Sequence, residues 1–424
     1  MTATNGTNIS DFEQRIAEAV KARAARMQEE LAGFVIQPTG LNHVEGLDAM
    51  RGMVAERLEG LGATVRAEPG RARPVWLTIQ DGEELSAETV APPVLVGSRL
   101  EGGSGPAILL CGHLDTVHDH RHVPHELRPV EGEPNLARGP GVMDMKGGIV
   151  LVLTALEVLH ELGQDLRFTA AFNSDEETGS FSSEHVLMAE AARHDVGLIV
   201  EPAVADGSLA VERMGSGQFM VEARGVSAHV GRAFESGASA VVALARAMVA
   251  LADHARPSAG RIVNIGPMHG GKATNAVPHV ARCWGNVRFK DEASQASLLA
   301  DFHQTIDHLN ASFSAESDPA ARLELHAEFN RPAKPLTPAV EALALRAREV
   351  SEALGTPLPF CSTGGVCDGN ILHAGGLPTI DTLGVRGGGM HRPDEFIELD
   401  SLVARGTMLA ILLHRLHQNG FSPA

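Results

Sequence analysis

Short apolar runs alternate with helical patterns through the first half of the chain, and this alternation restricts the fold more than any other feature. The runs at residues 107–111, 166–172 and 197–200 have the apolar character expected of strands buried on both faces. Helical patterns lie between successive runs, at residues 149–162 and 185–194. Strands that alternate with helices form a parallel sheet covered by those helices, so the sequence predicts an α/β fold.

Side chains that bind metal ions follow apolar runs. They are His113, Asp115, Asp144, Glu176, Glu177, Glu201 and His391. Because ligands of open α/β sheets gather at the carboxyl ends of the strands, we expect these side chains to lie close together. Imidazole and carboxylate groups suit zinc and similar ions, and a carboxylate shared by two ions holds them about 3.5–4 Å apart. The set therefore predicts a metal site and a hydrolase.

Length and charge narrow the class of protein. A chain of 424 residues is too long for one core and predicts two domains. The formal net charge of −18 argues against binding to nucleic acid or to an anionic membrane, since both need a basic patch. No apolar run approaches the roughly 20 residues that span a bilayer, and the N-terminus lacks the pattern of an export signal. The four cysteines have no paired spacing, so we expect reduced thiols in a cytoplasmic protein.

A second pattern begins after Glu201. It has the order strand, helix, strand, strand, helix, strand, which predicts a ferredoxin-like domain. The strands are expected at 218–223, 261–265, 281–289 and 322–328, and the helices at 238–255 and 293–309. This stretch holds none of the candidate metal ligands and His391 lies beyond it, so a small domain inserted into a larger one accounts for the order. The predicted division is a larger domain in two parts, 1–213 and 330–424, with a smaller inserted domain at 214–329.

Two helix boundaries are also readable. Ser10 and Glu13 fit a capping box, which predicts a helix that begins after Ser10. The proline-rich segment 330–338 is expected to be the linker that returns to the first domain, and a helix is expected at 339–354.

Four motifs follow one another along the chain: His-Leu-Asp-Thr-Val from His113, Asp-Met-Lys-Gly-Gly from Asp144, Asp-Glu-Glu-Thr-Gly-Ser from Asp175 and Glu-Pro from Glu201. Together they resemble the co-catalytic zinc peptidase and deacylase family, which includes glutamate carboxypeptidase, acetylornithine deacetylase, succinyl-diaminopimelate desuccinylase and aminoacylase. The resemblance covers nearly the whole chain. It implies a zinc-binding α/β domain interrupted by a smaller lid domain, and a homodimer whose contact the lid forms.

The resemblance also implies a role for each candidate ligand. His113 and Glu201 would bind one zinc ion, Glu177 and His391 would bind a second, and Asp144 would bridge the two. Cobalt or manganese are expected to substitute for zinc.

Two further acids have implied catalytic roles. Asp115 resembles the carboxylate that fixes the tautomer of the His113 ring. Glu176 resembles the general base and acid, which takes a proton from the attacking water and passes it to the departing nitrogen.

Four residues resemble the family's substrate-binding positions. His229, in Gly-Val-Ser-Ala-His, would reach the active site of the partner subunit. Asn275 and Arg288 would grip the substrate, and the planar guanidinium of Arg288 suits a free α-carboxylate. The alternative for Arg288 is a solvent-facing charge on a strand. Gly365 lies in a glycine-rich loop that lets the backbone approach the substrate closely.

The interpretation is a zinc-dependent amidohydrolase whose small-molecule substrate is an N-acyl amino acid or a short peptide with a free carboxylate. An aminopeptidase or dipeptidase of the same clan is an alternative, which needs an acidic group for the ammonium of the substrate. A catalytically silent homologue that only binds a metal or ligand is the alternative from another class, and the presence of Glu176 argues against it. The histidines His118, His120, His122 and His125 form either a solvated rim of the active site or a metal-binding tract.

Overall fold

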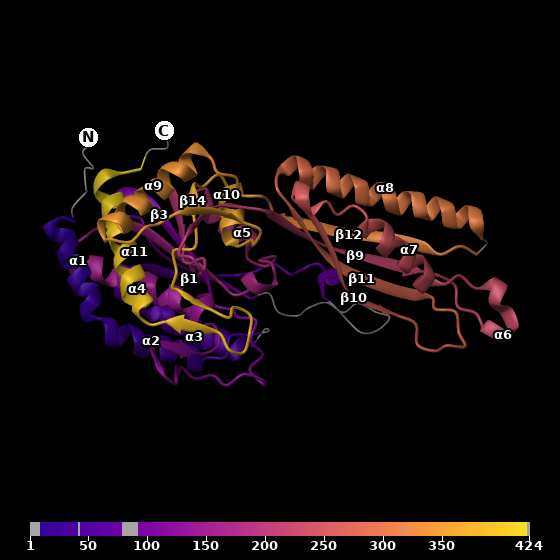
Figure 1. Cartoon of the computed structure of the whole chain (residues 1–424), viewed down its shortest axis with the longest axis horizontal. Coiled ribbons are helices and arrows are strands. Elements are labelled where there is room, and N and C mark those ends of the chain that lie inside the picture. Colours follow the sequence, from indigo (N-terminus) through magenta and orange to yellow (C-terminus); the bar gives the residue numbers. More distant parts are fainter. Residues whose placement is uncertain (1–8, 41–42, 79–91, 318, 422–424) are drawn as a thin grey trace.

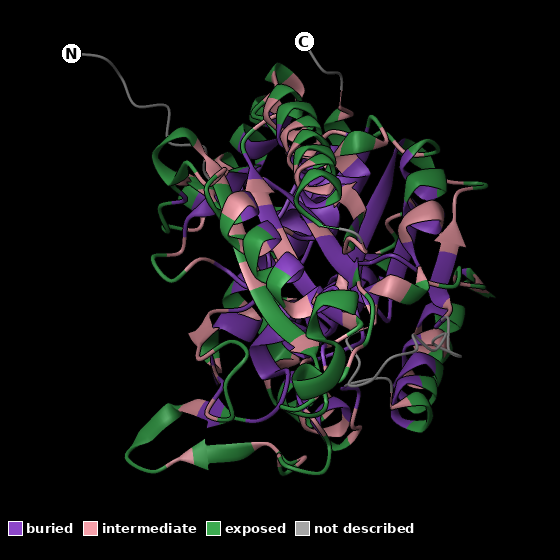
Figure 2. Ribbon diagram, turned by 90° about the vertical axis from the view of Figure 1, so that its right-hand side faces the viewer, coloured by how far each residue is buried: buried purple, intermediate pink, exposed green. Residues whose placement is uncertain are grey.

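The computed structural model describes residues 9–40, 43–78, 92–317 and 319–421, and these residues form two lobes (Figure 1). The larger lobe contains the first and the last described helices of the chain, and the smaller lobe is formed by a segment between them. Buried residues gather in the interior strands, and exposed residues lie on the outer faces of the helices (Figure 2). The predicted α/β class is confirmed.

A six-stranded sheet is the centre of the larger lobe, with the strand order β1-β2-β6-β3-β7-β14. Its strands are β1 (Thr64–Glu68), β2 (Val94–Arg99), β3 (Ser104–His113), β6 (Leu166–Asn173), β7 (Val196–Ile199) and β14 (Thr379–Ile380). Strands β6, β3, β7 and β14 run parallel, whereas β1 and β2 pair antiparallel at one edge. The three strands predicted first from the sequence are therefore the parallel middle of the sheet.

Helices cover both faces of this sheet. They are α1 (Asp11–Ala22), α2 (Ala24–Ile36), α3 (Val44–Gly60), α4 (Gly147–Glu161), α5 (Glu184–Ala191), α9 (Pro338–Ala353), α10 (Asp368–Ala374) and α11 (Asp400–Asn419). Successive residues of a strand point to opposite faces. Accordingly, Ile108 and Leu110 pack in the core that contains α4 and α11, while Leu109 and Cys111 pack in the core that contains α5 and α10.

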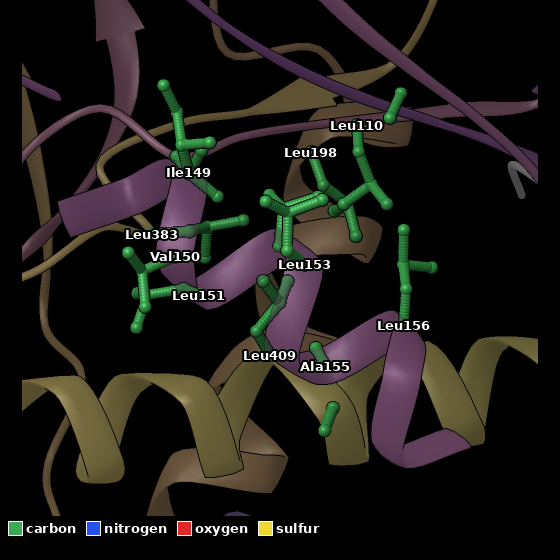
Figure 3. Close-up of a cluster of buried hydrophobic side chains, with 14 of the residues drawn as sticks. Leu110, Ile149, Val150, Leu151, Leu153, Ala155, Leu156, Leu198, Leu383 and Leu409 are labelled. Carbon is green, nitrogen blue, oxygen red and sulfur yellow. The ribbon is translucent and has the colours of Figure 1, made fainter. Parts of the chain in front are cut away.

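Helix α4 lies between the sheet and α11, as Figure 3 shows for the side chains of Leu153, Leu198 and Leu409. Its first turn needs glycine, because a Cβ atom at Gly148 would stand 2.3 Å from the carbonyl oxygen of Val200. This close approach brings the start of α4 against the end of β7. Truncation of a side chain as fully buried as Leu153 is expected to cost about 2–5 kcal/mol of folding free energy.

The smaller lobe has its own sheet and its own apolar core. The sheet has the antiparallel order β10-β11-β9-β12, and the chain order is strand, helix, strand, strand, helix, strand, as predicted. Its elements are β9 (Gly215–Arg224), α6 (Val230–Ala233), α7 (Ala240–Ala252), β10 (Arg261–Gly270), β11 (Val280–Phe289), α8 (Glu292–Glu316) and β12 (Arg322–Arg331). Phe219, Phe289 and Phe302 lie in this core, which is separate from the cores of the larger lobe.

The chain leaves and re-enters the larger lobe at one place. The backbone of Arg213 pairs with that of Lys334 through two hydrogen bonds, of 2.9 and 3.0 Å. The side-chain amide of Asn370 donates to the carbonyl oxygens of Met214 (2.8 Å) and Pro332 (2.7 Å), so it holds both crossings. The boundaries at 214 and 329 stay a prediction, and β12 itself runs on to Arg331.

Two small sheets complete the larger lobe. Their strands are β8 (Leu209–Arg213) with β13 (Phe360–Thr363), and β4 (Arg128–Val130), β5 (Glu133–Arg138), β15 (Gly387–Gly388) and β16 (Phe396–Glu398). The predicted capping box is present, since Ser10 and Glu13 bond reciprocally at the start of α1. The four cysteines are free thiols, as expected. Across the described residues, we find no helix with the length and apolar character of a membrane span.

Candidate active site

Three of the predicted metal ligands converge at the carboxyl edge of the central sheet. His113 is the last residue of β3, Asp144 lies in the turn Val142–Lys146 that precedes α4, and Glu177 lies in the turn Glu176–Thr178 that follows β6. One ligand atom from each lies within 4.8 Å of the others. The parallel strands end at the same edge, which is why residues far apart in sequence meet here.

Asp144 stands between two sets of side chains. Its Oδ1 atom lies 3.1 Å from Nε2 of His113, which in turn lies 3.9 Å from Oε1 of Glu201. Its Oδ2 atom lies 3.4 Å from Nε2 of His391, which lies 3.3 Å from Oε2 of Glu177. The two oxygens of one carboxylate therefore face two different histidines, each with a second carboxylate beside it.

The ring of His113 is held by the main chain. Its Nδ1 atom lies 2.9 Å from the carbonyl oxygen of Asp115. A carbonyl oxygen can only accept, so Nδ1 carries a proton, and Nε2 is the ring nitrogen that faces Asp144.

Asp115 contacts both the His113 ring and the loop that follows β6. Its carboxylate lies 3.6 Å from Nδ1 of His113, and it accepts hydrogen bonds from the backbone N–H groups of Glu176 (3.2 Å) and Glu177 (2.9 Å). The carbonyl oxygen of Asp115, at 2.9 Å, is the nearer acceptor for Nδ1. The Asp115 carboxylate thus positions the loop that carries Glu176 and Glu177.

His391 is the exposed member of the site. Its side chain is 57% exposed, and its backbone has a left-handed φ of 62°, which is costly for a residue other than glycine. The residue lies in the loop between β15 and β16, two positions after a run of three glycines whose first two form β15. The loop therefore places this histidine at the mouth of the site.

The acids of the site crowd one another. Burial raises the pKa of Glu201 well above its usual value, and the charge of Asp144 adds to the effect. Burial also raises the pKa of Asp115, to about 8. Burial would raise the pKa of Asp144 too, but hydrogen bonds from His113 and His391 outweigh it and hold that pKa low. Such a concentration of negative charge is stabilised by cations.

The donors present fit a metal ion. They are imidazole nitrogens and carboxylate oxygens, the groups that bind zinc, cobalt and manganese. Oε1 of Glu177 is buried without a hydrogen-bond partner among the described residues, which leaves it available as a ligand.

Glu176 is held by an arginine that the sequence did not reveal. Nη2 of Arg331 donates to Oε1 of Glu176 (2.7 Å), to its carbonyl oxygen (2.9 Å) and to Oγ of Ser180 (2.7 Å). Arg331 also lies 3.6 Å from the buried carboxylate of Asp368. In the sequence Arg331 belongs to the proline-rich stretch interpreted as a linker, and no signal in that stretch marked it as a buried partner of the catalytic loop.

A second missed residue, Glu395, shapes the loop of Asp144. Its carboxylate accepts hydrogen bonds from the backbone N–H groups of Gly141 (3.0 Å), Met143 (2.8 Å) and Asp144 (3.0 Å). His118 lies 2.7 Å from the same carboxylate and is only 5% exposed.

This contact corrects one expectation for the cluster of four histidines. His118 is not part of a solvated rim, because it is buried as a partner of Glu395. His120 and His122 are exposed and face Asp119 at 3.8 and 3.2 Å. His125 is half-buried, and burial lowers its pKa.

One cavity of about 560 Å³ contains candidate metal ligands and two of the four predicted substrate residues. Its lining includes Asp144, Glu176, Glu177, Glu201, Arg213, Arg288, Arg331, Gly365 and His391. Arg288 donates to Oγ of Ser216 (2.7 Å), to Oδ1 of Asn286 and to the carbonyl oxygen of Val287 (3.1 Å). Burial lowers its pKa, and the charge of Arg331 lowers it further. Arg288 thus faces the cavity with neutral partners, whereas Arg213 pairs with Asp381 (2.7 Å) and Arg331 with Glu176.

His229 and Asn275 lie elsewhere. His229 precedes α6, at the end of the smaller lobe that is far from the central sheet (Figure 1). The backbone N–H of Val230 donates to the carbonyl oxygen of Asn275 (3.1 Å), so these two predicted residues are neighbours. Both are exposed, and neither lines the cavity that holds the metal ligands.

Comparison with known proteins finds one family that matches most of the chain. Residues 109–415 match peptidase family M20/M25/M40. Carboxypeptidase G2 of Pseudomonas sp. (strain RS-16) is 28% identical over 380 residues, which cover 88% of this chain and 85% of that protein. A succinyl-diaminopimelate desuccinylase of Methylobacterium nodulans is 29% identical over 326 residues, which cover 72% of this chain and 79% of that protein.

Solved structures share the fold. A tripeptidase of Staphylococcus aureus has a TM-score of 0.72 and 20% identity, covering 93% of this chain and 99% of its own. An M20 family metallo-carboxypeptidase of Sulfolobus solfataricus has a TM-score of 0.68 and 15% identity, covering 92% of this chain and 99% of its own. Because the family match spans most of the sequence and its members share this fold, the chain belongs to peptidase family M20/M25/M40 and is a metal-dependent hydrolase of amide or peptide bonds.

Proposed function

We propose that the enzyme hydrolyses the amide bond of an N-acyl amino acid or short peptide in which the amino acid on the nitrogen side has a free α-carboxylate. The observation that carries this proposal is the environment of Arg288. It lines the same cavity as the metal ligands and Glu176, and its side-chain hydrogen bonds go to neutral groups. A guanidinium in that setting gains a charge-assisted, bidentate partner when a carboxylate enters.

The same cavity supports assignments for the metal ligands. We assign His113 and Glu201 to one zinc ion, Glu177 and His391 to a second, and Asp144 to both, because each of its oxygens faces one of the two sets. When bound, these ions would polarise the scissile carbonyl and acidify a water molecule toward neutral pH. Cobalt or manganese would serve the same ligands.

The protein's own side chains then handle the proton. Glu176 is only 7% exposed, and its Oε1 is fixed by Arg331, so its carboxylate has a defined position at the edge of the cavity. It takes the proton of the attacking water and delivers it to the departing nitrogen. Arg331 fixes Glu176, and Asp115 holds the backbone of the same loop from the other side. Gly365, in the wall of the cavity, leaves room for the backbone to meet the substrate.

We further propose that the enzyme acts as a homodimer, with His229 and Asn275 completing the active site of the partner subunit. Both residues are exposed at the end of the smaller lobe. Helix α7 presents Val242 (56% exposed) and Val249 (67% exposed), and β10 is an edge strand of the four-stranded sheet. Exposed apolar helix residues beside an edge strand form a surface suited to association with a second copy.

The test compares an N-acyl amino acid with its α-carboxamide. The carboxylate substrate is expected to have the higher kcat/KM, because the amide leaves Arg288 desolvated without a partner. Arg288→Ala and Arg288→Lys should each lower kcat/KM for the carboxylate substrate by about 2–5 kcal/mol of transition-state stabilisation. Neither variant should change turnover of the amide by a comparable factor.

Arg261→Lys is the matched control, since Arg261 lies in the same sheet and pairs with Asp301 at 2.8 Å. Equal turnover of the acid and the amide, with Arg288→Ala harmless, would make Arg288 a structural charge. A substrate with a free ammonium that is cleaved fastest would favour the aminopeptidase alternative instead.

A further inference from the structure

A buried arginine on α11 has no acidic partner. Arg405 is 8% exposed, and its Nη2 atom donates a hydrogen bond to the carbonyl oxygen of Gly207 (3.3 Å). Within the described ranges, no carboxylate lies in ion-pair distance of its guanidinium. Burial lowers its pKa to about 10, and the neighbouring charge of Arg386 acts in the same direction. A charge held in this way is costly for the folded protein unless an anion joins it.

Arg405 lines a cavity of about 620 Å³. Much of the rest of the lining is apolar: Leu354, Pro357, Leu358, Pro359, Ala404 and Met408. A cavity with an apolar wall and a few polar groups has the composition of a small-molecule site.

Neither acid in the lining pairs with Arg405. Asp206 accepts a hydrogen bond from the backbone N–H of Ser208 (2.9 Å), and Glu398 lies 2.9 Å from Arg386. Among the described residues, the guanidinium of Arg405 therefore has no carboxylate in ion-pair distance, and it lies beside an apolar surface.

This cavity is separate from the one that holds the metal ligands, although the two are neighbours. Ala205 lines both, Gly207 and Arg386 lie toward the Arg405 side, and Gly387 lies on the metal side. The chain segment 201–207 passes from the cavity of the metal ligands to the Arg405 cavity. The carbonyl oxygen of its first residue, Glu201, accepts a hydrogen bond from the backbone N–H of Gly384 (2.8 Å).

We propose that the Arg405 cavity is a second binding site, which takes an organic monocarboxylate with an apolar body. The carboxylate would pair with the Arg405 guanidinium, and the apolar body would lie against Leu354, Leu358 and Met408. A single unmatched guanidinium suits one negative charge, and the apolar wall suits a hydrocarbon chain better than a hydrated phosphate. The site is independent of the chemistry proposed for Arg288.

The experiment measures binding of hexanoate, hexanamide and inorganic phosphate by isothermal titration calorimetry. All proteins carry Arg288→Ala, which removes the carboxylate anchor proposed for the active site. Hexanoate is expected to bind at least tenfold more tightly than hexanamide and than phosphate. Adding Arg405→Met, which keeps an unbranched side chain like the stem of arginine and removes the charge, should weaken hexanoate binding at least tenfold. Circular dichroism and thermal unfolding check that the Arg405→Met variant is folded.

A second variant covers failure of Arg405→Met to fold. Ala404 is exposed and lines the same cavity, so Ala404→Phe obstructs it from the surface of α11 and leaves Arg405 in place. Loss of hexanoate binding in this variant supports the proposal. Three results would overturn it: equal binding of hexanoate and hexanamide, hexanoate binding that both variants leave unchanged, or no binding of hexanoate. Tighter binding of phosphate than of hexanoate would also overturn it.

Discussion

The metal-ligand cavity and the tip of the smaller lobe hold their histidines in opposite ways. His113 is 1% exposed, and its ring is fixed by a carbonyl group on one side and faced by a carboxylate on the other. His229 is exposed, and the contact that fixes its ring is a hydrogen bond from the backbone N–H of Gly231 (3.2 Å). The groups of the cavity are thus held in place within one chain, whereas the predicted substrate residues at the tip, His229 and Asn275, are exposed. A residue exposed in this way acts only if another surface, which we propose to be a second subunit, approaches it.

Removal of metal should have the largest effect on activity, because it acts on the cavity, whose side chains are already held in place within one chain. We expect 1,10-phenanthroline to abolish hydrolysis and zinc, cobalt or manganese to restore it, since the clustered carboxylates need cations. The isomer 1,7-phenanthroline, which does not chelate, is the control. A metal-free protein with full activity would contradict the assignment of the cavity.

Metal content tests whether Asp144 bridges two ions. Asp144→Asn should lose both ions because its two oxygens face the two sets of ligands, whereas His391→Ala should lose one. Plasma mass spectrometry of the purified variants gives the number of ions per chain. Equal losses in the two variants would show that Asp144 does not bridge.

Glu176→Gln should reduce kcat by about 10²–10⁴-fold while the metal content stays unchanged, because it removes the proton acceptor and keeps the shape of the side chain. Glu184→Gln, a change of the same kind on α5, is the control and should leave kcat unaltered. If Glu176→Gln loses metal instead, the roles of Glu176 and Glu177 are exchanged.

His229→Ala tests the role proposed for the exposed tip of the smaller lobe. We expect a fall in kcat of about 10²–10³-fold, the usual result of removing one group that stabilises the developing oxyanion, with no loss of metal. Mixing inactive His229→Ala chains with inactive Glu176→Gln chains should regain activity, because a heterodimer contains one complete site. Verified exchange of subunits without recovery would place the action of His229 within its own chain.

The smallest effect is expected at the apolar face of α7. Val249→Asp should weaken the dimer, shift the mass seen in analytical ultracentrifugation toward the monomer and lower activity at low enzyme concentration, since a buried unpaired charge opposes association. Leu345→Asp on α9 is the control, because Leu345 is a 41% exposed apolar residue on the larger lobe. A mass that Val249→Asp leaves unchanged would exclude this face from the interface.

The order of the elements was predictable because each strand and helix has its own local pattern. The parallel strands were readable as apolar runs, and His113 and Glu201 were readable as the polar residues that follow them. The inserted sheet was equally clear from its order of strands and helices.

The partners that hold the site were not predictable, because they depend on contacts between distant segments. Arg331 meets Glu176 across 155 positions of sequence, and Glu395 meets Asp144 across 251. Nothing local distinguishes a buried arginine from one in an exposed linker, and His118 similarly looked like one exposed histidine among four. Burial in such cases is decided by tertiary packing.

The paired backbones of Arg213 and Lys334 have a consequence for how this architecture arises and can be changed. Since the smaller lobe begins and ends at hydrogen-bonded neighbours, 2.9 and 3.0 Å apart at their N–H and carbonyl groups, a tight turn between these two residues would close the chain. We expect that a shortened gene joined there would still encode the central sheet and its metal ligands. Because the inserted domain begins and ends at one point, evolution or a protein engineer can exchange it for another domain without changing the topology of the rest of the chain.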